Sequence, residues 1–171
     1  IAKHQQVGVE EALINLAVAT NGRGKVINQA MSAKHIDHLV EFPHAIVSTD
    51  GVGYGEKFVT TGGYDHPSCF GAMTRLFTRY VKERAMPIEV AIAKITALPA
   101  AQLNLKDRGY IKEGYRADMV IFDPEEIKTD ATYRQPAMYA EGMDTVILNG
   151  HIIMAQGVPL HKNEGQLIIS S

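Results

Sequence analysis

The sequence predicts an α/β fold that ends in a small, separate β unit. Apolar residues recur at helical spacing over 9–19, which predicts a helix there. Two apolar runs, 25–31 and 45–48, alternate with helical segments. This order is typical of parallel sheets, because parallel strands need crossover helices. An Asn149-Gly150 pair between two further apolar runs predicts a β-hairpin over 145–154.

Other local signals place the remaining elements of the first half. Asn21-Gly22-Arg23-Gly24 ends the first helix, and Ser32 is suited to cap the next helix, which should end before Pro43. A long loop rich in Gly and Tyr follows over 51–67, and loops of that length in compact domains are usually functional or disordered. The helices expected after the first are 33–40, 70–84, 87–96 with Pro87 at its first position, and a helical turn at 98–103.

The pattern changes after Leu105. A turn at 107–110 precedes a predicted strand over 118–124, which Asp-Pro stops, and Gly157-Val158-Pro159 closes the hairpin. We therefore divide the chain into an α/β part, 1–104, and a small β part, 105–171.

Composition narrows the function classes. The 171 residues include 17 Lys+Arg and 19 Asp+Glu, a formal net charge of −2, and 46% are hydrophobic. A chain of this length can bury a core. Near-neutral charge gives no electrostatic reason to expect nucleic acid or an anionic membrane as partner. No apolar run approaches the ~18–20 residues of a spanning helix. The single cysteine, Cys69, excludes an intrachain disulfide, so we expect a cytoplasmic protein.

Asp50 is the first candidate for chemistry. It follows the predicted strand 45–48 and opens the long loop. Catalytic groups of parallel α/β folds gather at the carboxyl ends of strands, where a carboxylate can bind a metal or act as a general base. The plain alternative is that Asp50-Gly51 is only a turn.

Other polar residues have weaker signals. His66 closes the long loop and could bind substrate or cap the helix that follows. His35 and His38 share a helix face with Asp37 between them, but a pair without a third ligand favours a solvated face over a metal site. Cys69 is best interpreted as a small buried thiol. A helical stripe of Arg75, Arg79, Lys82 and Arg84 is interpreted as solvated.

A longer motif in the β part resembles the closing signature of the amidohydrolase superfamily. It runs from Gly109 to Pro124 (GYIKEGYRADMVIFDP) and is accompanied by the hairpin VILNGH at 146–151. Upstream, TALPAA at 96–101 resembles the segment that leads from the last barrel helix to the family's sheet. Within the superfamily the D-aminoacylase (N-acyl-D-amino-acid deacylase) branch is the most similar, on STDG at 48–51, His66-Pro67, Phe70-Gly71, Arg75 and YVKE at 80–83.

This resemblance implies a fold, a reaction and site residues. The fold would be the C-terminal part of a TIM-like (β/α)₈ metal-dependent hydrolase barrel, followed by part of a small β-sandwich. The reaction would be zinc-dependent hydrolysis of a non-peptide C–N amide bond in a small N-acylated amino-acid-like substrate. Asp50 would be the catalytic general base and acid and a metal ligand, and the substrate-binding residues would be His66, Ser68 and Arg75.

Two departures from the family pattern qualify these expectations. The residue after His-Pro is typically an Arg suited to a substrate carboxylate, and here it is Ser68, which cannot replace a bidentate guanidinium. The family's other metal ligands have no counterpart, and zinc needs about three protein ligands. We therefore expect zinc or another divalent metal to take most ligands from upstream of Ile1, with the rest of the barrel or an oligomeric partner completing the site.

Three hypotheses follow from the sequence. The first is a D-aminoacylase-like amidohydrolase of which this chain alone is inactive. The second keeps the superfamily but changes the substrate, to a dihydroorotase- or hydantoinase-like cyclic amide or another acyl amine, because of Ser68. The third is a non-catalytic assembly module that pairs through its open edges.

Overall fold

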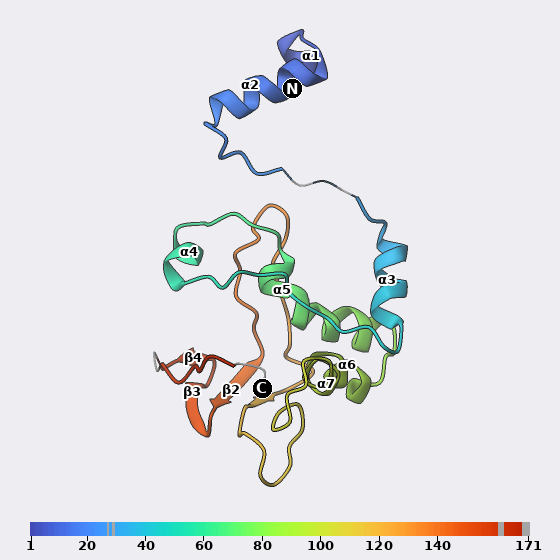
Figure 1. Ribbon diagram of the computed structural model, residues 1–171, viewed down its shortest axis with the longest axis vertical. Coiled ribbons are helices and arrows are strands. Elements are labelled where there is room, and N and C mark those ends of the chain that lie inside the picture. Colours follow the sequence, from blue (N-terminus) through green and yellow to red (C-terminus); the bar gives the residue numbers. More distant parts are fainter. Residues whose placement is uncertain (27, 29, 161–162, 169–171) are drawn as a thin grey trace. The chain divides into compact units, whose positions relative to one another are not determined.

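The computed structural model describes residues 1–26, 28, 30–160 and 163–168 and divides the chain into two units, Ile1–Ser32 and Ala33–Ser171 (Figure 1). The first unit holds α1 (Ala2–Gln5) and α2 (Val9–Ala19). The predicted helix over 9–19 is therefore confirmed, and it ends where Asn21 and Gly22 take positive φ angles of 51° and 71°.

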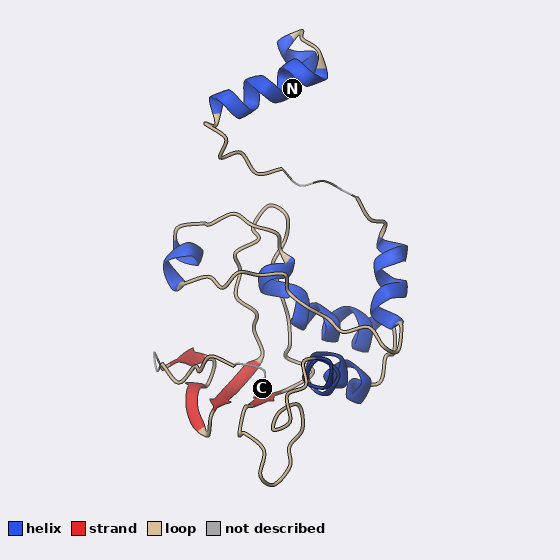
Figure 2. Cartoon of the chain, viewed as in Figure 1, coloured by secondary structure: helices blue, strands red, loops and turns tan. Residues whose placement is uncertain are grey.

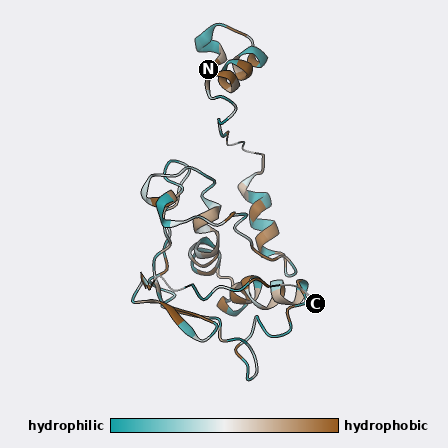
Figure 3. Ribbon diagram, turned by 60° about the vertical axis from the view of Figure 1, so that its left-hand side comes forward, coloured by the Kyte–Doolittle hydropathy of each residue, from teal (hydrophilic) through white to brown (hydrophobic). Residues whose placement is uncertain are grey.

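Four apolar side chains of α2 are exposed: Val9, Leu13, Ile14 and Val18. Figure 3 shows hydrophobic colouring on parts of this helix. The strand predicted at 25–31 is absent from the described residues of that run, while residues 27 and 29 lie outside them. None of the helices in the described parts of the chain combines the length and the apolarity that crossing a membrane requires.

The helices of the second unit follow the predicted order. They are α3 (Ala33–Glu41), α4 (Glu56–Thr60), α5 (Ser68–Arg75), the π-helix η1 (Leu76–Glu83), α6 (Ile88–Ile95) and α7 (Ala97–Gln102). The helix predicted over 70–84 is thus one continuous run of α5 and η1 whose second half is wider. Pro87 precedes α6 instead of occupying its first position. The long loop 51–67 contains one short helix, α4, that the sequence did not predict.

The strand predicted at 45–48 is wrong, because this segment joins no sheet in the described structure. Its backbone bonds to a helix instead: the Val47 N–H donates to the carbonyl oxygen of Lys94 at 3.2 Å. A strand exists only where a neighbouring strand accepts and donates its ladder bonds. The apolar run therefore adopts an extended connection between α3 and Asp50.

The sheet of the second unit is a four-stranded antiparallel meander of order β1-β2-β3-β4 (Figure 2). Its strands are β1 (Met119–Phe122), β2 (Met143–Leu148), β3 (His151–Ala155) and β4 (Val158–Pro159). The predicted hairpin is confirmed, since Asn149 and Gly150 turn with φ angles of 50° and 81°. Positive φ at both central residues matches the right-handed twist of the flanking strands. The parallel arrangement expected from the sequence is not seen among the described residues.

The core lies where η1 packs against α6 and the segment after β1. Its buried residues are Leu76, Phe77, Tyr80, Ala91 and Ile127. Phe77 also meets Phe122 of β1 edge-on, with ring centroids 5.3 Å apart. The wide helix therefore links the helical part of the second unit to its sheet.

A polar network joins α3 to η1. Arg79 donates two hydrogen bonds to Asp37, at 2.9 and 3.1 Å to Oδ1, and one at 2.9 Å to Oδ2, while the Tyr80 hydroxyl donates to Oδ1 at 2.9 Å. Arg84 pairs with Glu41 at 2.5 Å and lies 3.6 Å from Asp37. Hydrogen bonding from Arg79 is the main reason that the pKa of Asp37 is lowered.

The basic stripe is exposed at Arg75, Lys82 and Arg84, as expected, and half-buried at Arg79, but its cations also have protein partners. Arg79 and Arg84 bind acidic residues of α3, Arg75 binds a carbonyl oxygen, and Lys82 donates to the carbonyl oxygen of Glu125 at 2.8 Å. A lone helix with such a stripe would be solvated. Here, tertiary packing brings acceptors to each cation.

Lys94 lies among apolar neighbours on α6, and its side chain is fully buried. Its ammonium donates to the carbonyl oxygens of Phe42 at 2.6 Å and Ala45 at 3.1 Å, just beyond the end of α3. A cation is favourable there, because the last carbonyl groups of a helix are unpaired and carry partial negative charge. Burial lowers the pKa of Lys94. The residue holds the chain at the point where it turns toward Asp50.

Replacing Asp37 should change how stability depends on pH. Because its pKa is lowered in the folded chain, ionised Asp37 stabilises the fold above the ordinary value of 3.8, and this contribution disappears as the pH falls through the lowered pKa. We expect Asp37→Asn to reduce the free energy of unfolding at neutral pH and to flatten its decline in acid, measured by urea denaturation. Glu83→Gln, an exposed site on η1, is the control; equal acid profiles for Asp37→Asn and the parent chain would contradict the assignment.

Replacing Lys94 should destabilise the second unit. Lys94→Met keeps the length of the side chain but removes the donor to the carbonyl oxygens of Phe42 and Ala45. The Phe42 oxygen keeps the N–H of Ala45, so we expect a cost of about 1–3 kcal/mol, mainly from the Ala45 oxygen. Thermal and urea denaturation would measure the loss. Lys106→Met removes an exposed lysine and should leave stability nearly unchanged. If both variants unfold alike, Lys94 does not secure this turn.

Candidate functional site

Asp50 lies at the end of the extended run that leaves α3. It is exposed and has a φ of 53°, in the left-handed region that few residues other than glycine adopt. Hydroxyl groups bracket it: Ser48 Oγ accepts from the Asp50 N–H at 3.4 Å, and Thr49 Oγ1 accepts from the Gly51 N–H at 3.2 Å. These local bonds satisfy the backbone in a turn that has no sheet beside it. They leave the carboxylate at the surface of the turn.

Ser68, the first residue of α5, joins this turn to His66. Its hydroxyl lies 3.1 Å from the carbonyl oxygen of Thr49, to which it donates, and 2.8 Å from His66 Nδ1. The Ser68 backbone N–H also lies 3.2 Å from Nδ1. Three of the predicted site residues, Asp50, His66 and Ser68, are thus brought together by residues that adjoin in sequence or share hydrogen bonds.

A tyrosine from the distant segment 129–136 completes the arrangement. The Tyr133 hydroxyl lies 3.3 Å from His66 Nε2, and the two rings meet edge-on with centroids 5.3 Å apart. In Figure 1 this segment rises beside α5 and the loop that carries α4. Both ring nitrogens of His66 therefore have protein partners.

The long loop is anchored from within. The Tyr54 hydroxyl donates to Asp65 Oδ2 at 2.7 Å and lies 3.5 Å from Cys69 Sγ, and these bonds, the one to Cys69 first, raise the pKa of Tyr54. Its ring stacks on Phe58 and Phe70, with centroids 4.5 and 5.0 Å away. Cys69, predicted as buried, is half-buried under this contact. The loop thus has a small aromatic cluster of its own.

Arg75 lies on the same helix as Ser68 but about two turns further along, roughly 10 Å by helix geometry. Its guanidinium donates to the carbonyl oxygen of Ala131 at 3.0 Å. The structure therefore shows Arg75 in contact with the segment that carries Tyr133. Its predicted contact with substrate stays a prediction.

The described residues do not form a metal site by themselves. They contain no group of three or more His, Cys, Asp or Glu side chains that could hold a metal ion. The neighbours of Asp50 in the candidate site are hydroxyls and one imidazole that already has two partners. His35 and His38 are exposed on α3, and Asp37 between them is bound by Arg79. Asp50 could contribute one ligand to a metal that other groups hold.

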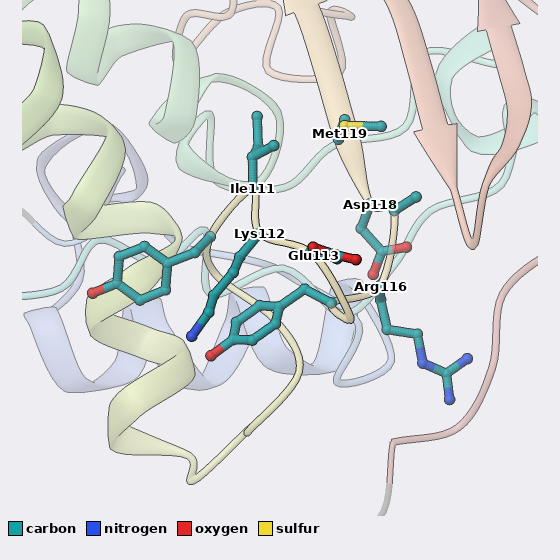
Figure 4. Close-up of a pocket in the computed structure, with 9 residues that line it drawn as sticks. Ile111, Lys112, Glu113, Arg116, Asp118 and Met119 are labelled. Atoms are coloured by element: carbon teal, nitrogen blue, oxygen red, sulfur yellow. The ribbon is translucent and has the colours of Figure 1, made fainter.

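A hollow of about 320 Å³ lies at the turn that leads into β1 (Figure 4). Residues between Tyr110 and Met119 line it, and the ammonium of Lys112 lies 5.4 Å from the centroid of the Tyr115 ring. The lining contains none of the candidate site residues. Its segment is part of the motif that carries the family resemblance, and it introduces the sheet.

Residues missed by sequence reasoning are Tyr133, Tyr54 and Lys94. The abundance of Tyr in the loop 51–67 was the one signal that pointed toward Tyr54. Tyr133 lies 67 positions from its partner His66 and has no local motif, so only the tertiary structure reveals it. Lys94 occupies a helical position that periodicity alone treats as surface.

Comparison with known proteins identifies the family. The model of the "Amidohydrolase family" matches residues 60–154, more than half of the chain. The N-acyl-D-glutamate deacylase of Alcaligenes xylosoxydans xylosoxydans is 32% identical over 134 residues, which make up 78% of this chain and 26% of that protein. The chain therefore spans about a quarter of the length of this curated relative.

Solved structures give the same picture. A crystal structure of D-aminoacylase superposes with a TM-score of 0.70 at 28% identity, over 79% of this chain and 27% of that one. The N-acyl-D-glutamate deacylase from Bordetella bronchiseptica, complexed with zinc and a phosphonate inhibitor that mimics the tetrahedral intermediate, has a TM-score of 0.64 at 32% identity, over 75% and 27%. With the matched family model, these similarities show that the chain belongs to the amidohydrolase family and is homologous to the D-aminoacylases.

Proposed function

We propose that this chain supplies the proton-transferring carboxylate, Asp50, of an enzyme that removes the acyl group from N-acylated D-amino acids. The observation that supports this most directly is the backbone of Asp50. A φ of 53° places Asp50 in a left-handed turn, a conformation that aspartate adopts more readily than most residues, at the end of the run that leaves α3. Here the bonds of Ser48, Thr49 and Ser68 enforce it.

The reaction is hydrolysis of an amide C–N bond. A water oxygen attacks the carbonyl carbon, and Asp50 accepts the proton that this water loses. When the C–N bond breaks, Asp50 returns the proton to the departing amine nitrogen, so a carboxylate and an amine leave the site. A positioned carboxylate can serve both steps because it is the base in the first and the acid in the second.

The substrate contacts that we assign are His66, Ser68 and Arg75, with the loop 51–67 as part of the wall. His66 and Ser68 adjoin the Asp50 turn, which supports their assignment. Arg75 is a cation on the same helix, and a guanidinium suits a carboxylate group of the substrate. The names of the homologues support an N-acyl-D-amino acid as the substrate class.

The metal would be held mainly by groups outside this chain. The zinc complex of the Bordetella bronchiseptica homologue supports a zinc-dependent enzyme. The described residues contain no group of side chains that could hold a metal ion. We therefore propose that Asp50 contributes at most one ligand and that residues outside this chain contribute the others. In this proposal residues 1–104 belong to a (β/α)₈ barrel and residues 105–171 to a β-sandwich beside it.

A second candidate substrate for this enzyme is a cyclic amide, or another acyl amine, that lacks the carboxylate of an amino acid. Ser68 favours it, because its hydroxyl is engaged with Thr49 and His66 and cannot form the bidentate bond of a guanidinium. A substrate panel of N-acyl-D-glutamate, N-acyl-D-aspartate and hydantoin, a cyclic amide without a carboxylate, separates the two candidates. Preference for hydantoin would replace the first with the second.

Asp50→Asn should abolish most turnover in the enzyme that contains this chain. Asparagine keeps the size of the side chain but cannot carry the proton, so we expect kcat to fall about 10²- to 10⁴-fold. The assay follows amine release from N-acyl-D-glutamate. Asp130→Asn, at an exposed aspartate, is the control and should be nearly fully active. Undiminished kcat in Asp50→Asn would eliminate Asp50 as the proton carrier.

The 171-residue chain alone should neither bind zinc tightly nor hydrolyse N-acyl-D-glutamate. The reason is that the described residues contain no group of three side chains that could hold a metal ion. Titration calorimetry with zinc and an assay in the presence of zinc test the two statements separately. Tight binding at one site that Asp50→Asn weakens, together with turnover, would show that the chain itself completes the metal centre.

A further inference from the structure

The segment that carries Tyr133 contains a closed turn, 132–135. The Thr132 N–H donates to the carbonyl oxygen of Gln135 at 3.1 Å, and the Gln135 N–H donates to Thr132 Oγ1 at 3.1 Å. These two bonds close the backbone around the two residues between them, Tyr133 and Arg134. Both of these residues are exposed, so a turn of defined shape presents their side chains to solvent.

This turn is fastened to the rest of the second unit. The residues on either side of it, Ala131 and Pro136, are buried. The carbonyl oxygen of Ala131 accepts from Arg75 of α5 at 3.0 Å, and the Tyr64 hydroxyl donates to the carbonyl oxygen of Tyr133 at 2.6 Å. The turn is thus held by α5, the helix that begins inside the candidate site, and by the long loop.

Arg134 differs from the other arginines of the second unit. Each of the others donates to a carboxylate, an amide or a carbonyl group: Arg75 to Ala131, Arg79 to Asp37, Arg84 to Glu41, Arg108 to Asp118 and Arg116 to Asp107 and Asn149. The guanidinium of Arg134 has no such partner among the residues that the structure describes. It therefore keeps its whole fork of N–H donors for a ligand.

Arg134 is also one position from a side chain that reaches the candidate site. The Tyr133 hydroxyl lies 3.3 Å from His66 Nε2, and Ser68 Oγ lies 2.8 Å from His66 Nδ1. The Cα atoms of adjacent residues are about 3.8 Å apart, and the side chains of arginine and tyrosine are similar in length. The space beside His66 is therefore within reach of the Arg134 guanidinium.

An N-acyl-D-amino acid needs a cation in this site. The Asp50 carboxylate would repel the carboxylate of such a substrate, because like charges repel. The Ser68 side chain carries no charge that offsets this repulsion. Arg75 lies about two turns further along α5, and its guanidinium already donates to the carbonyl oxygen of Ala131. Among the described arginines of the second unit, Arg134 is the one that remains free for this task.

We propose that Arg134 is a specificity-determining residue, whose guanidinium binds the α-carboxylate of the N-acyl-D-amino acid. This role rests on the function proposed above, because it concerns that class of substrate. The planar fork of a guanidinium donates two parallel hydrogen bonds to the two oxygens of a carboxylate. The closed turn and the contact of Tyr133 with His66 hold the backbone of Arg134 in place, so the cation is offered from a fixed distance.

Three substrates test the proposal in the enzyme that contains this chain: N-acetyl-D-glutamate, its α-amide and its side-chain amide. Arg134→Gln should raise KM about 10- to 100-fold for the two substrates that keep the α-carboxylate, the range expected for a lost hydrogen bond to a charged group. The value of kcat should stay nearly unchanged, because this contact is made equally in the bound substrate and in the transition state. For the α-amide, KM should not change.

Control variants separate this role from a structural one. Arg134→Lys should recover part of the affinity, since lysine keeps the charge but lacks the planar fork. Lys106→Gln, at an exposed lysine outside the candidate site, should leave KM unchanged for every substrate. Urea denaturation of the 171-residue chain should give Arg134→Gln the same free energy of unfolding as the parent, because the side chain has no described partner.

Several outcomes would overturn the proposal. One is an unchanged KM for N-acetyl-D-glutamate in Arg134→Gln, and another is an equal rise for all three substrates. A rise confined to the acid and its α-amide would assign Arg134 to the side-chain carboxylate instead.

A parent enzyme that hydrolyses none of the three substrates would refute the proposed function. Calorimetry with N-acetyl-D-glutamate then tests Arg134 separately. Binding that Arg134→Gln weakens about 10- to 100-fold would uphold its role as the carboxylate-binding residue. Binding that is absent, or equal in parent and variant, would refute that role as well.

Discussion

The buried ammonium of Lys94 is the contact on which the candidate site depends. The segment that carries Asp50 has no strand beside it, so nothing in a sheet fixes its direction. Lys94 replaces that support by binding the carbonyl oxygens of Phe42 and Ala45, and its own carbonyl oxygen accepts from Val47. A cation at this place is stable because it faces the carbonyl end of α3. Lys94 of α6 thus sets the direction of the chain that leads to Asp50.

A second support reaches the same turn from the other side. Ser68 holds Thr49, and Ser68 in turn begins the helix that continues into η1 and the core. The Asp37–Arg79 pair then ties η1 back to α3, where the segment starts. These contacts connect α3, η1 and α5 back to Thr49, so the backbone beside Asp50 is supported from two sides.

Local patterns predicted what depends on neighbouring residues only. The helix at 9–19 and the turn at Asn149-Gly150 were predicted correctly because periodicity and positive φ are properties of a few adjacent residues. The strand at 45–48 was wrong because a strand requires a partner, and partners are long-range. Asp50 and His66 were identifiable beside the loop, whereas Tyr133 and Lys94 were not, since their roles arise from contacts 67 and 49–52 positions away.

Ser68 shows how one small residue can change what a site recognises and what holds it together. A long basic side chain at this position could reach a ligand, whereas the short Ser68 side chain lies between Nδ1 of His66, at 2.8 Å, and the carbonyl oxygen of Thr49, at 3.1 Å. Ser68 therefore connects His66 to the turn that carries Asp50. Recognition of a substrate carboxylate, if the enzyme needs it, must then come from another cation.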